Sequence, residues 1–122
     1  MDLLIRHLHD ELGPAVIAIL HDHDAGLDAI VVVDNIAGGP AIGGVRMAPD
    51  VDVNEVVRLA RAMTFKNAAA GLPHGGGKAG IVADSACAPA EKEHLLRAFA
   101  RAIRTMTDYI PGPDMGTDEM CM

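Results

Sequence analysis

The chain has 122 residues, a common length for one domain, and half of them are apolar, so a hydrophobic core can form. Its formal net charge of -7 argues against nucleic acid and anionic membranes as partners. No apolar run approaches the roughly 20 residues of a membrane span. The first residues do not resemble a signal peptide, so we expect a cytoplasmic protein. Cys87 and Cys121 lack metal-type spacing and are expected to be reduced thiols.

The first half of the chain predicts one short helix and three extended segments. Leucines at rough helical spacing predict a helix over residues 2–12. Two apolar runs, at 15–20 and 29–33, are separated by a polar turn and predict a β-hairpin. Paired glycines then bracket a short extended piece that continues to Met47.

The second half predicts two long helices, each followed by a strand. Asp52, with a glutamate three residues later, fits a capping box before an amphipathic helix over 53–70. An apolar strand is expected over 78–83, and Pro89 suits the first turn of the next helix. A last short strand is expected at 109–110. This order predicts a single α/β domain in which helices pack on a mixed β-sheet.

Two lysines and one aspartate stand out from the acidic background. Lys66 lies near the end of the first long helix, beside its apolar stripe. Lys78 lies among glycines, and Asp114 follows a rigid Pro-Gly-Pro turn. Taken singly, each has a more common explanation: a cation at a helix C-terminus, a solvated turn residue, and a turn former. Together they indicate an anion site, in which a partly desolvated lysine can act as a general acid or base.

Other motifs carry weaker signals. Residues 75–80 match a GxGxxG pattern, but a helix precedes it and a strand-like run follows, the reverse of a dinucleotide-binding turn. His21 and His23 form an HxH pair in a polar turn, where an exposed pair without a metal is the usual state, so we expect no metal site. His74, beside the glycines, is the one histidine that we place near the anion site.

Four sequence blocks together resemble a known family. They are GPAIGGVR at 39–46, MTFK at 63–66, LPHGGGKAG at 72–80 and PDMGT at 113–117. In this order, they resemble the N-terminal, substrate-binding and oligomerisation domain of the Glu/Leu/Phe/Val dehydrogenases. These enzymes are NAD(P)-dependent amino acid dehydrogenases, and the resemblance covers nearly the whole chain. Each block alone is a weak signal, whereas the four in order are highly specific.

The resemblance implies chemical roles for the three charged residues. Lys66 is expected to grip the α-carboxylate of the substrate. Lys78 is expected to be the catalytic lysine, which polarises the carbonyl or imine and handles the attacking water. Asp114 is expected to relay protons to and from the amino group. Oxidative deamination passes through an imine that water attacks, so an anion clamp, a base and a carboxylate suit that reaction.

The resemblance also implies the walls of the substrate pocket. Met63 and Ile42 are expected to line it, and the backbone at Gly43 and Gly44 is expected to pass close to the substrate. Glutamate-specific members usually have a lysine where this chain has Ile42, which offers no charge. Burying an unpaired carboxylate is costly. We therefore expect an apolar amino acid, or the matching 2-oxo acid, as the small-molecule partner.

In the family, NAD or NADP is bound by a second, Rossmann-type domain, which we do not find in this sequence. Residues 1–122 are therefore expected to be a substrate-binding and oligomerisation domain, either a fragment or a standalone chain. Alone it should bind no cofactor and should not turn over. Two alternatives remain open: a non-catalytic oligomerisation module, and a small-acid binding protein. By the same resemblance, the chain is expected to form a homo-oligomer, a dimer or a hexamer.

Overall fold

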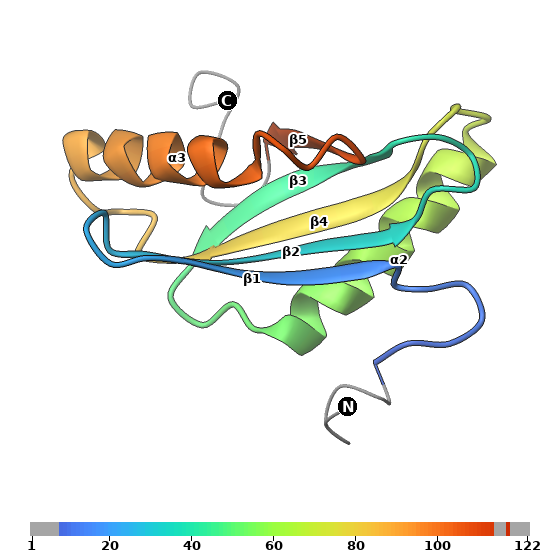
Figure 1. Cartoon of the computed structure of the whole chain (residues 1–122), viewed down its shortest axis with the longest axis horizontal. Helices are drawn as coiled ribbons and strands as arrows, with labels where there is room; N and C mark the ends of the chain where they lie inside the picture. Colours follow the sequence, from blue (N-terminus) through green and yellow to red (C-terminus); the bar gives the residue numbers. More distant parts are fainter. Residues whose placement is uncertain (1–7, 114–116, 118–122) are drawn as a thin grey trace.

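The computed structural model of the chain describes residues 8–113 and Thr117 (Figure 1). Within these residues, five strands form one sheet, with helix α2 on one face and helix α3 on the other (Figure 1). The predicted single mixed α/β domain is confirmed. The elements, in chain order, are β1 (Val16–Asp22), β2 (Leu27–Asn35), β3 (Ala41–Ala48), α2 (Val53–Ala69), β4 (Gly75–Val82), α3 (Pro89–Ile103) and β5 (Tyr109–Pro113).

The sheet has the strand order β1-β2-β4-β3-β5. β1 and β2 form the predicted antiparallel hairpin, and β2 is also antiparallel to β4. β3 runs parallel to both β4 and β5. Because α2 connects the parallel neighbours β3 and β4, it crosses over the face of the sheet as parallel pairing requires. β4 is the central strand, and α2 crosses it with Thr64 over Gly76 and Val56 over Gly80.

Two sequence-based predictions differ from the structure. The strand expected over 78–83 begins at Gly75, so the glycine run belongs to β4 and is not a turn. Glycine carries little strand signal, and here it marks a close approach of other backbone. The helix expected over 2–12 falls partly outside the described residues, and residues 8–12 are not helical. The Asp10 carboxylate instead accepts hydrogen bonds from the N–H groups of Leu12 and Gly13, which competes with helix formation.

Helix α2 begins as its sequence predicts. The Asp52 side chain accepts a hydrogen bond of 2.8 Å from the Glu55 N–H, as expected of an N-cap residue. The Glu55 carboxylate accepts a hydrogen bond from Arg46 on β3, which ties the first turn of α2 to the sheet. At the other end, the buried Asn67 amide donates to the Gly75 carbonyl at 2.8 Å, so the last turn is held to the start of β4.

The two faces of the sheet are packed differently. The α3 face carries the larger apolar cluster, which includes Phe99 and Met47. On the α2 face, the helix lies against bare backbone of β4. A Cβ added at Gly76 would lie 2.1 Å from the Thr64 nitrogen, and one at Gly80 would lie 3.1 Å from the Val56 side chain. The two glycines therefore let α2 come down onto β4 on either side of the residue between them, Lys78.

Candidate substrate-binding site

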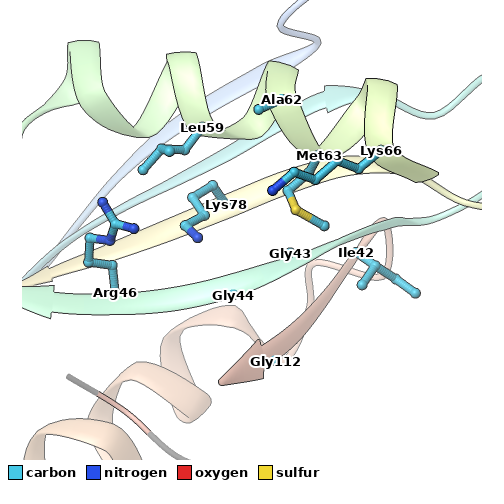
Figure 2. A pocket seen from close by; sticks show the side chains of 10 residues that line it. All are labelled: Ile42, Gly43, Gly44, Arg46, Leu59, Ala62, Met63, Lys66, Lys78 and Gly112. Atoms are coloured by element: carbon cyan, nitrogen blue, oxygen red, sulfur yellow. The ribbon is translucent and has the colours of Figure 1, made fainter. Parts of the chain in front are cut away.

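A cavity of about 400 Å³ opens between α2 and the strands β3 and β4 (Figure 2). Seven residues were expected to bind the substrate or to act in catalysis; six of them line this cavity, and the seventh, Asp114, lies outside the described residues. The full lining is Ile42, Gly43, Gly44, Arg46, Leu59, Ala62, Met63, Lys66, Lys78 and Gly112. The structure thus brings together residues that are far apart in the sequence.

Helix α2 forms one wall of the cavity with a single flank. Leu59, Ala62, Met63 and Lys66 follow the spacing i, i+3, i+4 and i+7, which places side chains on one side of a helix. Their side chains meet the cavity in Figure 2, with Lys66 nearest the C-terminal end of the helix. Lys66 is an exposed residue, so its ammonium lies at the mouth of the cavity. A cation placed there can meet a carboxylate that arrives from solvent.

Lys78 lies in the middle of β4 and is only 6% exposed. Its side chain extends from the strand into the cavity, on the face that α2 covers (Figure 2). The sequence alone suggested the start of a strand, where a solvated lysine would be ordinary. A buried ammonium instead requires hydrogen-bonding or anionic partners, because an unsatisfied buried charge is very costly. Because its side chain reaches the cavity, Lys78 can also contact the polar end of a bound acid.

Strand β3 forms the opposite wall with alternate residues. Ile42, Gly44 and Arg46 share the face toward the cavity, as period-two geometry requires. Gly43 lines the cavity with its backbone, and a Cβ there would lie 1.5 Å from the Gly77 carbonyl oxygen. The Tyr109 hydroxyl donates to the Gly43 carbonyl at 2.9 Å. Close packing of β3 on β4 thus explains the glycine at 43, independently of any ligand.

Arg46 was not expected in the site from its sequence. It lines the cavity at the end away from Ile42 (Figure 2), and its Nη1 donates to the Glu55 carboxylate at 2.7 Å. Strand alternation from Ile42 through Gly44 would have placed it on the same face. Leu59 and Ala62 were missed in the same way, although helical spacing from Met63 and Lys66 predicts their flank.

None of the histidines that the structure describes is among the residues that line the cavity. His74 Nδ1 lies 3.0 Å from the Pro40 carbonyl oxygen, and the residue is absent from the ten that line the cavity. His21 pairs with Asp28 across the β1–β2 hairpin at 2.7 Å. Among the described residues, there is no group of His, Cys, Asp and Glu side chains that could hold a metal ion. Within the same residues, no helix is long and apolar enough to cross a membrane.

The fold and the cavity define an α/β domain with a cavity that one exposed and one buried lysine line. The chain belongs to the Glu/Leu/Phe/Val dehydrogenase family, because that family's dimerisation domain matches residues 15–122. It is 38% identical over 113 residues to a valine dehydrogenase of Streptomyces virginiae, covering 88% of this chain and 31% of that protein.

Solved structures of amino acid dehydrogenases contain a part with the same fold. An L-tryptophan dehydrogenase from Nostoc punctiforme superposes with a TM-score of 0.85 at 30% identity, over 98% of this chain and 36% of that one. A hetero-hexameric glutamate dehydrogenase from Thermus thermophilus superposes with a TM-score of 0.81 at 34% identity, over 88% of this chain and 29% of that one. The chain therefore spans about a third of the length of these relatives.

Proposed function

We propose that this chain is the substrate-binding and catalytic-lysine half of an NAD(P)-dependent amino acid dehydrogenase. Such an enzyme interconverts an L-amino acid and its 2-oxo acid. The observation that carries the proposal is the pairing of Lys66 and Lys78 in one cavity. Lys66 comes from α2 and lies at the mouth, whereas Lys78 comes from β4 and is buried.

In this proposal, the two lysines divide the polar end of the substrate between them. Lys66 binds the α-carboxylate, in a charge-assisted contact worth about 1.5–3 kcal/mol. Lys78 donates to the carbonyl or imine group, and its positive charge stabilises the negative charge that develops on oxygen. Asp114, outside the described residues, is proposed to move the proton to and from the amino group.

The glycine-rich segment does not fit the phosphate groups of a nicotinamide cofactor. The glycine-rich segment at 75–80 is part of strand β4 and not a strand-to-helix turn that could cradle a pyrophosphate. We therefore assign NAD or NADP to a separate domain of a longer parent enzyme. The 122-residue chain on its own is expected to bind substrate without turnover, and the cytoplasm remains its predicted location.

The substrate proposed for the parent enzyme is an apolar amino acid. Ile42, Leu59, Ala62 and Met63 contribute apolar side chains to the cavity wall beside the two lysines. A second carboxylate placed near Ile42 would lose its hydration without gaining a charged partner there. Arg46, at the far end, already pairs with Glu55. A branched aliphatic 2-oxo acid therefore suits this cavity better than 2-oxoglutarate.

The exposed edge of the sheet supports oligomerisation of the chain. β1 lies at one end of the strand order, and its Val16 and Ile19 are 41% and 66% exposed. An open edge with apolar side chains favours pairing with a second strand. We propose that the chain forms a homo-oligomer, a dimer or a hexamer. Light scattering at micromolar concentration tests this, and a monomeric mass would count against it.

Calorimetric titration with a branched 2-oxo acid, 4-methyl-2-oxopentanoate, tests the proposed site. We expect weak binding by the unaltered chain and no detectable binding by Lys66→Ala. Lys92→Ala is the matched control, because it removes the same charge from α3, which packs on the other face of the sheet. Equal affinity in the unaltered chain and Lys66→Ala would remove Lys66 from the site.

A further inference from the structure

The flank of α2 that faces away from the cavity carries a polar network. Asp34, at the end of β2, is fully buried, and its Oδ2 accepts hydrogen bonds from Arg61 Nε at 2.8 Å and Thr64 Oγ1 at 2.7 Å. The two Nη atoms of Arg61 donate to the two oxygens of Asp10 at 2.9 and 2.8 Å. Nη2 also lies 3.4 Å from the Gly13 carbonyl. We call these five residues the Arg61 network.

Helix geometry places this network opposite the cavity. At about 100° of rotation per residue, Arg61 and Thr64 point roughly 180° away from the flank that lines the cavity. The buried residues Val56, Ala60 and Asn67 lie between the two flanks. One side of α2 is thus tied to β2 and to the segment before β1, while the other side presents the cavity lining.

The surface beneath α2 gives the helix little lateral support. Gly76 and Gly80 leave bare backbone under it. Among the described residues, the apolar cluster on this face has 5 buried members, against 15 on the α3 face. Helices keep their position on a partner largely through side chains that fit into grooves, and a glycine strand supplies few of them. Hydrogen bonds therefore contribute to the position of α2: Glu55 and Asn67 hold its two ends, and Arg61 holds its middle.

The charges of Arg61 and Asp34 make the contact between them costly to break. Asp34 is a buried carboxylate whose Oδ1 has no hydrogen-bond partner among the described residues. Arg61 is its counter-charge, and removing one partner of a buried pair is strongly destabilising. Hydrogen bonding to Arg61 also holds the pKa of the Asp10 carboxyl well below its usual range, so Asp10 stays ionised in mild acid.

We infer that the Arg61 network is a positioning device for the substrate cavity. By tying α2 to β2 and to the segment at 10–13, it sets the separation between Met63 and Lys66 on the helix and Lys78 on β4. The ligand in this inference comes from the proposed function, whereas the positioning is a property of the ligand-free chain. Asp10 is thereby a positioning residue that acts on the cavity through Arg61.

Asp10→Asn tests the inference without altering a cavity residue. Glu93→Gln is the matched control, because Glu93 accepts from the guanidinium of Arg97 at 2.9 and 2.7 Å on the exposed surface of α3. The readout is the methyl resonance of Met63, measured by NMR in the ligand-free chain. Met47, buried on the opposite face, is the internal reference. We expect Asp10→Asn to shift Met63 alone and Glu93→Gln to shift neither methionine.

An unchanged Met63 resonance in Asp10→Asn would overturn the inference, and so would an equal shift of Met47, which indicates a global change. The second readout is the affinity for 4-methyl-2-oxopentanoate. We expect Asp10→Asn to weaken it by about 2- to 30-fold, with partial recovery in Asp10→Glu. If the unaltered chain binds no 2-oxo acid, the proposed function fails, while the Met63 measurement still decides whether the network positions α2.

Discussion

Gly76→Ala should lift helix α2 from the sheet and weaken the substrate cavity. The added Cβ would lie 2.1 Å from the Thr64 nitrogen and 2.4 Å from the Ala60 carbonyl oxygen, both of them helix backbone. An ordinary contact begins at 3.4 Å, so the helix must rise by about 1.3 Å at this point. Met63 and Lys66 lie on the same stretch of helix and would move away from Lys78.

The stability cost can be set against a matched control. Inserting a methyl group into a packed site costs about 1–3 kcal/mol. Replacing glycine by alanine also gains about 0.4–1 kcal/mol through the unfolded state, wherever the backbone allows it. Gly38→Ala receives the same gain without the clash, because its nearest neighbour, the His74 carbonyl oxygen, would lie at 3.5 Å. At about 4 °C per kcal/mol, Gly76→Ala should melt about 4–12 °C below Gly38→Ala.

Thermal unfolding and calorimetry together check this prediction. Besides having a lower Tm, Gly76→Ala should bind 4-methyl-2-oxopentanoate about tenfold more weakly. This change corresponds to the loss of one charge-assisted hydrogen bond of about 1.5 kcal/mol. Gly38→Ala should bind as the unaltered chain does. If Gly76→Ala matches Gly38→Ala in both Tm and affinity, the reasoning that α2 rests on bare backbone beside the site is refuted.

Three further changes have defined outcomes. Ile42→Lys should raise the affinity for 2-oxoglutarate by about tenfold or more, since it adds a charged partner for the second carboxylate. Calorimetry with 2-oxoglutarate and 4-methyl-2-oxopentanoate checks this. An unchanged preference between the two acids would contradict the placement of Ile42 beside the substrate side chain. Arg61→Ala should lower the free energy of unfolding by about 3–5 kcal/mol, because Asp34 stays buried without its counter-charge; a loss under about 1 kcal/mol in urea unfolding would count against the ion pair. Asn67→Ala should cost about 1–3 kcal/mol, because the Gly75 carbonyl loses its donor; an unchanged Tm would show that the bond is dispensable.

Elements with local signals were predictable from the sequence. Helix α2, expected over 53–70 and observed as Val53–Ala69, has both an N-cap residue and a clear apolar period. The start of β4 was not predictable, because glycine at 75–77 has no strand preference and is used there for the close approach of Asn35, helix α2 and Tyr109. At the N-terminus, Asp10 forms a turn where the leucine spacing suggested a helix.

The candidate site was also predictable from the sequence only in part. The sequence motifs predicted that Lys66 and Lys78 would meet, and both line the cavity. The Arg61 network could not be foreseen, because Asp10 and Arg61 are 51 residues apart and neither lies in a motif. Pairing of that kind depends on where the folded sheet places each element, which no local pattern encodes.

The most direct test of the central claim is to locate the binding site of a 2-oxo acid by NMR. Amide resonances of the chain would be followed during titration with 4-methyl-2-oxopentanoate. We predict shifts centred on β4 at Lys78, on β3 at Ile42 and Gly44, and on the last turns of α2 at Met63 and Lys66. Shifts confined to other surfaces, or none at saturating ligand, would contradict the claim that this cavity is a substrate half-site.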